Sequence, residues 1–180
     1  MGVELGFEVY SAYGVSIFYP EGWRVELNPT SKKLEGDVVF HSPEKDKLYV
    51  SWGPLDKAKR RFGSVEKHAE YSVERIRRSR DVSGFEVSES VRSDVNGHEA
   101  VFMSVRFNVS QPSVFGFKGK PSPKSVYSMH LYCEDSSRYL VVYTLLNEEV
   151  GERVFEDVKK CVNSLKCHNN TVEYNGELRQ

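Results

Sequence analysis

The chain has 180 residues, 39% of them hydrophobic and 12% aromatic, which excludes a disordered chain and favours a globular protein rich in β-sheet. Its formal net charge is −1, so the molecule as a whole has no field that would draw it to nucleic acid or to an anionic membrane. No apolar run has the length needed to cross a bilayer, and we expect no membrane contact.

Residues 1–6 lack a basic segment followed by an apolar one, so we expect neither a signal peptide nor lipid attachment. The cysteines Cys133, Cys161 and Cys167 are an odd number in a chain large enough to fold without disulfide bonds. Both observations favour free thiols and a cytoplasmic location.

The first predicted elements are two strands, residues 15–19 and 23–27, each with apolar residues on alternate positions. The sequence Tyr-Pro-Glu-Gly separates them. Pro20 fits the second position of a type I turn and Gly22 fits the fourth, so the two strands are expected to meet at this turn.

A second strand pair and a helix are predicted next. The strands, residues 37–42 and 47–52, flank a short polar connector, and Trp-Gly-Pro ends the second of them. Ser64 is a suitable N-cap for a helix that reaches about Arg80. Apolar residues recur at helical spacing along this segment, at Val65, Ala69, Val73 and Ile76.

Two hairpins follow. The first spans residues 85–107 and turns at Asn96-Gly97, the strongest short hairpin signal in a sequence. The second spans residues 126–146 and turns at residues 134–137. The strand after this second turn is apolar on both faces, which is typical of a strand in the middle of a sheet that helices cover on both sides.

The last predicted element is a helix over residues 150–165, where an apolar stripe has helical period. Acidic residues near its start and lysines near its end complement the helix dipole. We expect one domain over residues 1–167, with a solid interior that leaves recognition to the exterior, and a polar tail over residues 168–180.

The order of these elements resembles the family that contains PsbP and Mog. The local features that carry the resemblance are Tyr19-Pro20-Glu21-Gly22-Trp23, the helix over residues 64–80, and Asn96-Gly97-His98-Glu99-Ala100. The match covers roughly residues 7–166, and it implies an α+β fold, an α/β/α sandwich with a mostly antiparallel central sheet flanked by helices. It further implies a noncatalytic scaffold, without a cofactor, that docks on a larger protein.

No catalytic motif is present in the sequence: there is no phosphate-binding loop, no dinucleotide fingerprint and no nucleophile elbow. His130 and Cys133 have the residue types of a metal site, and Cys161, Cys167 and His168 are further candidates. Residues three apart on a strand point to opposite faces, however, and Cys161 belongs to the apolar stripe of the last helix. We therefore expect no metal site.

Charge is distributed unevenly. Residues 56–80 hold nine basic and four acidic residues, a net +5, whereas residues 134–157 hold seven acidic and two basic, a net −5. The basic region is a candidate surface for an acidic partner. The alternative is a solvated helix face with internal pairs such as Glu74 with Arg78. The candidate contact residues in this region are Lys57, Lys59, Arg60, Arg61 and Arg78.

A long connector, residues 109–124, supplies the other candidate contacts, Phe115 and Phe117. Connectors of this length tend to be functional, although the two rings are equally suited to covering an open edge of the core. Three hypotheses follow: a protein-interaction domain that uses one of these regions, a binder of nucleic acid or anionic ligands through residues 57–80, and a hydrolase or small-ligand carrier without a recognisable motif.

Overall fold

Seven strands form one antiparallel sheet, in the order β3-β4-β5-β9-β8-β7-β6. The computed structural model describes residues 6–110, 120–147 and 152–168, without the side chains of residues 152–154. The strands of this sheet are β3 (Arg24–Leu27), β4 (Gly36–His41), β5 (Lys47–Pro54), β6 (Val82–Val95), β7 (His98–Ser110), β8 (Pro121–Cys133) and β9 (Arg138–Asn147).

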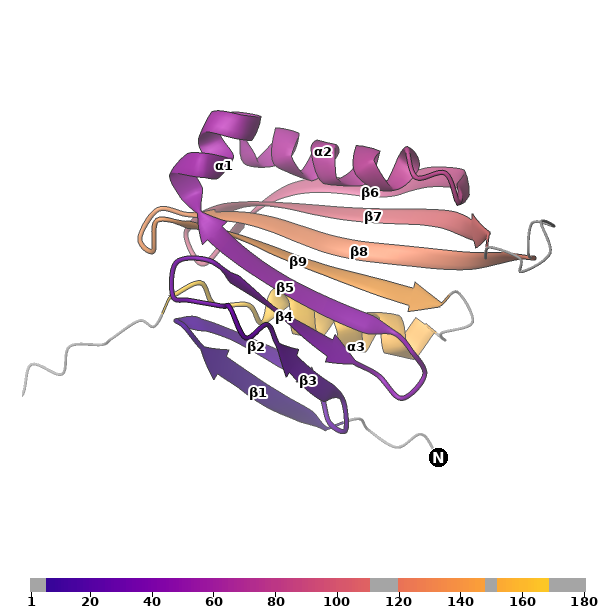
Figure 1. Cartoon of the computed structure of the whole chain (residues 1–180), viewed down its shortest axis with the longest axis horizontal. Coiled ribbons are helices and arrows are strands. Elements are labelled where there is room, and N and C mark those ends of the chain that lie inside the picture. The colour runs from indigo at the N-terminus through magenta and orange to yellow at the C-terminus, as the bar shows by residue number, and fades with distance from the viewer. Residues whose placement is uncertain (1–5, 111–119, 148–151, 169–180) are drawn as a thin grey trace, which may run out of the picture.

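Helices cover both faces of this sheet (Figure 1). The helices α1 (Leu55–Phe62) and α2 (Val65–Arg77) lie on one face. The other face is covered by α3 (Glu152–Asn163) together with a separate two-stranded sheet, β1 (Phe7–Ala12) and β2 (Val15–Pro20). The predicted α+β fold, an α/β/α sandwich with an antiparallel central sheet, is confirmed, and the β1–β2 hairpin completes one of its layers.

The expected pairing of the two strands around the Tyr-Pro-Glu-Gly turn is wrong. β2 pairs with β1, and β3 pairs with β4, so the chain passes between the two sheets at this turn. The turn runs from Pro20 to Trp23, whose amide donates to the carbonyl of Pro20 at 3.2 Å. Gly22 has φ +82°, as the third position of a type II turn requires, in place of the predicted type I.

The other predicted strand pairs are confirmed. β4 pairs with β5, β6 with β7 across Asn96-Gly97, and β8 with β9 across residues 134–137. Asn96 and Gly97 have φ +55° and +83°, as a type I′ turn requires. β9 is the fourth of the seven strands, so its prediction as the central strand is also confirmed.

The helices differ from the prediction in one respect, because α1 was not expected. It follows Pro54 directly and buries only Leu55 and Ala58, a pattern too short to reveal a helix in the sequence. The Ser64 side chain caps α2 as predicted, since its oxygen accepts from the amide of Lys67. No helix among the described residues is long and apolar enough to cross a membrane.

Candidate functional site

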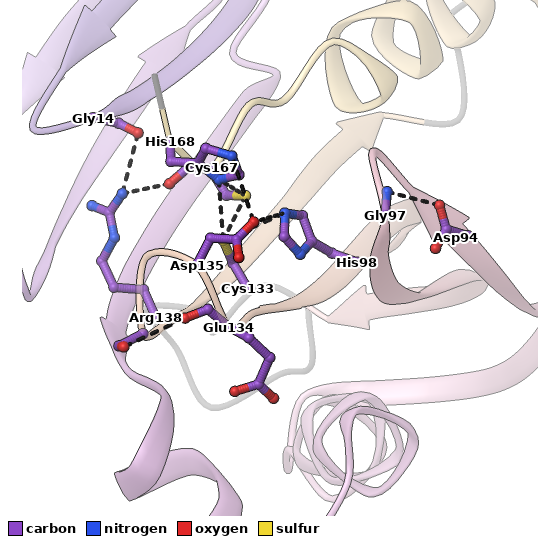
Figure 2. Close-up of polar contacts among 11 residues, drawn as sticks. Gly14, Asp94, Gly97, His98, Cys133, Glu134, Asp135, Arg138, Cys167 and His168 are labelled. Carbon is purple, nitrogen blue, oxygen red and sulfur yellow. Dashed lines mark hydrogen bonds and ion pairs between the residues drawn. The ribbon is translucent and has the colours of Figure 1, made fainter. Parts of the chain in front are cut away.

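The described residues gather chemically reactive side chains in two places, on opposite sides of β8. His130 points into a cleft of about 410 Å³ between α2 and the sheet. Cys133 lies on the other face, at the end of the sheet where two hairpin turns meet (Figure 2). The prediction that residues 130 and 133 point to opposite faces is therefore confirmed. The α2 side of the sheet differs from the solid interior that we expected.

The cleft holds a chain of three hydrogen-bonding residues. His130 is only 1% exposed, and its Nε2 lies 3.0 Å from the Ser72 hydroxyl. That hydroxyl donates in turn to the backbone carbonyl of His68 at 3.0 Å, so the Nε2 of His130 must carry the proton and donate to Ser72. A nucleophilic serine would instead donate to its base, so this arrangement does not activate Ser72.

Burial keeps both histidines of the cleft neutral. Desolvation, helped by the charge of Arg61, lowers the pKa of His68 to about 4. Desolvation, helped by His68, lowers the pKa of His130 to about 3. Neither is an efficient general base near neutral pH. No carboxylate lines the described cleft, and the Nδ1 atoms of both rings lack a hydrogen-bond partner among the described residues.

The second site, which we call the Cys/His cluster, consists of His98, Cys133, Cys167 and His168. One nitrogen or sulfur atom from each of the four residues lies within 4.8 Å of the others. The Cys133 Sγ is 3.6 Å from the His98 Nε2 and 3.4 Å from the His168 Nδ1, and the Cys167 Sγ is 3.2 Å from the same Nδ1. The two sulfurs are 2.8 Å apart, and both cysteines are free.

Three separate segments bring these residues together. His98 begins β7 and Cys133 ends β8, one position beyond the paired residues Glu99 and Tyr132. Residues opposite each other in an antiparallel pair point to the same face, so the sheet itself places His98 beside Cys133. Cys167 and His168 arrive from the segment after α3, whose Lys166 forms backbone hydrogen bonds with Ser16 of β2.

Two aspartates support the cluster. The Asp94 carboxylate accepts from the amide of Gly97 at 2.9 Å, which fixes the turn that presents His98 (Figure 2). The Asp135 carboxylate lies 3.8 Å from the Nε2 of His98 and 3.8 Å from the Nε2 of His168. The Asp135 side chain is 68% exposed, so this end of the cluster is open to solvent.

Arg138 holds the backbone around the cluster. Its guanidinium is buried and donates to four carbonyls, those of Tyr13 and Lys33 at 2.8 and 2.9 Å, Gly14 at 3.1 Å and Cys167 at 2.6 Å. The β1–β2 turn approaches closely, because a Cβ on Gly14 would lie 3.3 Å from the Arg138 Nη2. Burial lowers the pKa of Arg138, whereas Cys133 and Cys167 act to raise it.

The two cysteines of the cluster differ in acidity. The pKa of Cys133 is lowered to about 4, first because the Cys167 thiol donates to its sulfur and also because of the contact with the His168 ring, whereas burial acts to raise it. The pKa of Cys167 is raised, because it holds the proton that the pair shares. Cys161 lies outside the cluster, and burial raises its pKa to about 12.

The cluster is the part of the molecule that the sequence did not predict. The candidate metal ligands in the sequence analysis were His130, Cys133, Cys161, Cys167 and His168, and His98 was not among them. His168, which we expected to begin a polar tail, is a half-buried member of the cluster instead. The expectation that the chain binds no metal stays a prediction, although the geometric reason for it does not apply to these four residues.

The predicted basic contacts lie at two distant places. Lys57, Lys59, Arg60 and Arg61 are on α1, whereas Arg78 is the C-cap at the far end of α2, about 20 Å along a helix of 13 residues. They therefore form no single patch. Their role in binding a partner, and the hypothesis of a nucleic-acid or anionic ligand, stay predictions.

Most of these basic side chains already have partners. Lys57 pairs with Glu35, Lys59 with Glu134, Arg60 with Asp56, and Arg78 with Glu74. Arg61 donates to the Tyr71 hydroxyl and lies over the Phe62 ring. The solvated helix face with ion pairs, which was the alternative interpretation, describes this region well. Phe115 and Phe117 lie outside the described residues.

Comparison with known proteins reveals relatives in fold only. No protein-family model matches the chain, and no curated protein matches it. The solution structure of cyanobacterial PsbP (CyanoP) from Synechocystis is similar with a TM-score of 0.54 and 14% identity, over 91% of this chain and 93% of its own. The Ran-binding protein Mog1p of Saccharomyces cerevisiae is similar with a TM-score of 0.57 and 8% identity, over 91% and 96%. The chain thus has the PsbP/Mog-like fold that its sequence predicted.

Proposed function

From this PsbP/Mog-like fold, we propose that the protein is a noncatalytic protein-interaction domain. The fold supports a docking function, because Mog1p, one of the proteins that are similar in fold, is a Ran-binding protein. Fold alone does not carry function, so the proposal depends on a surface of this chain.

The observation that carries the proposal is the outer face of the β1–β2 hairpin. Val9 and Phe18 are opposite each other in the register and are 59% and 46% exposed, and Phe7 beside them is 37% exposed. The inner face of the same hairpin buries Val15 and Ile17 completely. The hairpin is thus apolar on both faces, although only one face packs on the core, and an uncovered apolar face is typical of a contact surface.

The alternative of an enzyme is less well supported by the same structure. The Ser72 hydroxyl is committed to a backbone carbonyl, and the His130 beside it has a pKa far below neutrality. The basic surface of α1 offers a weaker docking site than the hairpin, because three of its four cations are paired with Glu35, Glu134 and Asp56.

The proposal is tested by comparing matched variants of the full chain in affinity capture from cells. In the test variant, Val9 and Phe18 are both changed to Ser. In the control, the similarly exposed Val87 and Val91 of β6 are changed to Ser. We expect a protein that the wild type and the control capture and that the test variant does not. With that protein purified, the test variant should bind at least about 30-fold more weakly, as expected for the loss of an apolar anchor.

Two results would contradict the proposal. Equal capture by both variants would exclude the hairpin, and loss of capture in Arg60→Glu alone would favour the basic surface instead. Self-association of the wild type in analytical ultracentrifugation that the test variant lacks would identify the hairpin as a contact between copies of this chain.

A second candidate is a small-ligand carrier, which the cleft beneath α2 favours. Its buried His130 presents an Nδ1 acceptor that has no partner in the described part of the chain, and Arg75 and Tyr143 also line the space. Such a site would suit a small molecule with a hydrogen-bond donor and an acidic group. Thermal-shift screening of small carboxylic acids tests it: a hit lost in His130→Asn supports the carrier, and no hit contradicts it.

A further inference from the structure

We propose that the Cys/His cluster is a structural zinc site, with His98, Cys133, Cys167 and His168 as its four ligands. Two thiols and two imidazoles are the ligand set of closed tetrahedral zinc sites. The inference is independent of the protein-interaction function.

The distances between the ligand atoms support tetrahedral coordination. Bond lengths of about 2.3 Å to sulfur and 2.0–2.1 Å to nitrogen place a sulfur and a nitrogen about 3.5 Å apart in a tetrahedron. Three of the four sulfur–nitrogen distances of the cluster, 3.6, 3.4 and 3.2 Å, are close to this value, and the fourth is no longer than 4.8 Å. The two sulfurs, at 2.8 Å, would separate to about 3.8 Å when zinc enters.

The surroundings supply what a zinc site needs beyond its ligands. His168 turns its Nδ1 toward the sulfurs and its Nε2 toward the Asp135 carboxylate, which lies 3.8 Å away. The exposed Asp135 side chain is thus on the side of the ring from which a carboxylate can orient a zinc-bound histidine. Cys133, Cys167 and His98 are buried, whereas Asp135 is exposed, so the ligands are shielded but the metal can enter.

Charge balance also favours an ion at this place. Zinc binds both cysteines as thiolates, so the proton on Cys167 would leave when the metal enters, and Arg138, which donates to the Cys167 carbonyl, offers only one positive charge beside the two thiolates. Zn²⁺ neutralises both thiolates, and the remaining charges of Arg138 and Asp135 then offset each other. The described cluster thus accommodates a divalent cation without an unpaired charge.

The site has a clear structural role. Zinc would join the start of β7 and the end of β8 to the segment after α3, three segments that are distant in sequence. It would therefore fasten the α3 layer, and with it the β1–β2 hairpin that pairs with Lys166, onto the central sheet. All four coordination positions are filled by protein, so the site leaves no open position for catalysis.

The test measures zinc binding by the reduced full chain. We expect one equivalent of Zn²⁺ after dialysis, determined by elemental analysis. His98→Ala and Cys133→Ser should each weaken binding by more than about 100-fold in competition with a chelator, because even changes outside the ligand shell cost about 10–100-fold. Cys161→Ala removes the one described cysteine outside the cluster and should bind zinc like the wild type.

Three results would overturn the proposal. The first is retention of less than about one tenth of an equivalent of Zn²⁺ by the folded, reduced wild type. The second is equal retention by wild type and His98→Ala. The third is a disulfide between Cys133 and Cys167, found by mass spectrometry, whose reduction leads to no zinc uptake. If Cys133→Ser does not fold, the zinc content of the folded wild type and of Cys161→Ala still decides.

Discussion

Strand β8 directs His130 toward α2 and Cys133 toward the opposite face of the sheet. The surroundings of His130 disfavour a charged side chain, whereas the surroundings of Cys133 contain charged groups of both signs. In the cleft, aromatic rings and helix α2 desolvate His68 and His130, and no described carboxylate or thiolate compensates a positive charge. In the Cys/His cluster, thiols, Asp135 and Arg138 supply charges of both signs within a few ångströms. The same residue type is therefore a neutral packing group in one place and a candidate metal ligand in the other.

The largest expected effect comes from removing the charge that supports the cluster. Arg138→Leu leaves four backbone carbonyls without their donor in a buried place, and it should lower the free energy of unfolding by about 3–5 kcal/mol in urea denaturation. Arg24→Leu, which removes an exposed arginine from a surface pair, is the control and should cost less than about 1 kcal/mol. A loss below about 1 kcal/mol in Arg138→Leu would show that the guanidinium does not hold these segments.

The two buried histidines of the cleft should make the free energy of unfolding depend on pH. The folded pKa of His130 is about 3, and in the unfolded chain it returns to about 6.5, so the unfolded state binds the proton first as the pH falls. Stability contributed by the neutral ring is present above pH 6.5 and is lost between about pH 6.5 and 3. His68 acts in the same direction, down to about pH 4.

The measurement is the free energy of unfolding at pH 7, 6 and 5. The wild type should lose up to about 1.4 kcal/mol more per pH unit than His130→Asn below pH 6.5, whatever the stability of the variant at pH 7. Both proteins keep the Cys/His cluster, so their difference isolates the cleft. Val91→Ser, an exposed change on β6 that adds or removes no titratable group, should keep the wild-type slope. Parallel curves for wild type and His130→Asn would contradict the assignment of a buried neutral ring.

The smallest effect is expected from changing Asp135, which lies beside the cluster but is not one of its four proposed ligands. Asp135→Asn keeps the size of the side chain but removes the charge near both imidazoles, and it should weaken zinc binding by about 10–100-fold. Glu134→Gln changes the neighbouring carboxylate of the same turn, which pairs with Lys59 instead, and should leave zinc affinity unchanged. Equal affinities of the two variants would show that Asp135 does not orient the ligands.

The sequence predicted the fold and one half of the cluster's framework. Asn96-Gly97 and residues 134–137 located both hairpin turns, and an antiparallel register between the hairpins is sufficient to place His98 beside Cys133. Spacing along one strand or helix does not reveal this pair, because His98 and Cys133 lie on different strands. The spacing rule itself was sound, since His130 and Cys133 do point to opposite faces.

The remaining features required tertiary structure. Cys167 and His168 reach the cluster because Lys166 pairs with Ser16 and because Arg138 donates to the carbonyl of Cys167, contacts between segments more than 25 residues apart. Nothing local in the sequence encodes either contact. The cleft was missed for a similar reason, because helical periodicity gives the face that α2 buries but not how closely α2 approaches the sheet.

The most direct test of the contrast between the two sites is X-ray absorption at the zinc edge of the reduced, zinc-loaded full chain. The account predicts two sulfur ligands at about 2.3 Å and two nitrogen ligands at about 2.0–2.1 Å, the signature of two cysteines and two histidines. A zinc shell made only of nitrogen and oxygen would place the metal elsewhere, with the cleft histidines as candidates. That result would contradict the assignment of the Cys/His cluster.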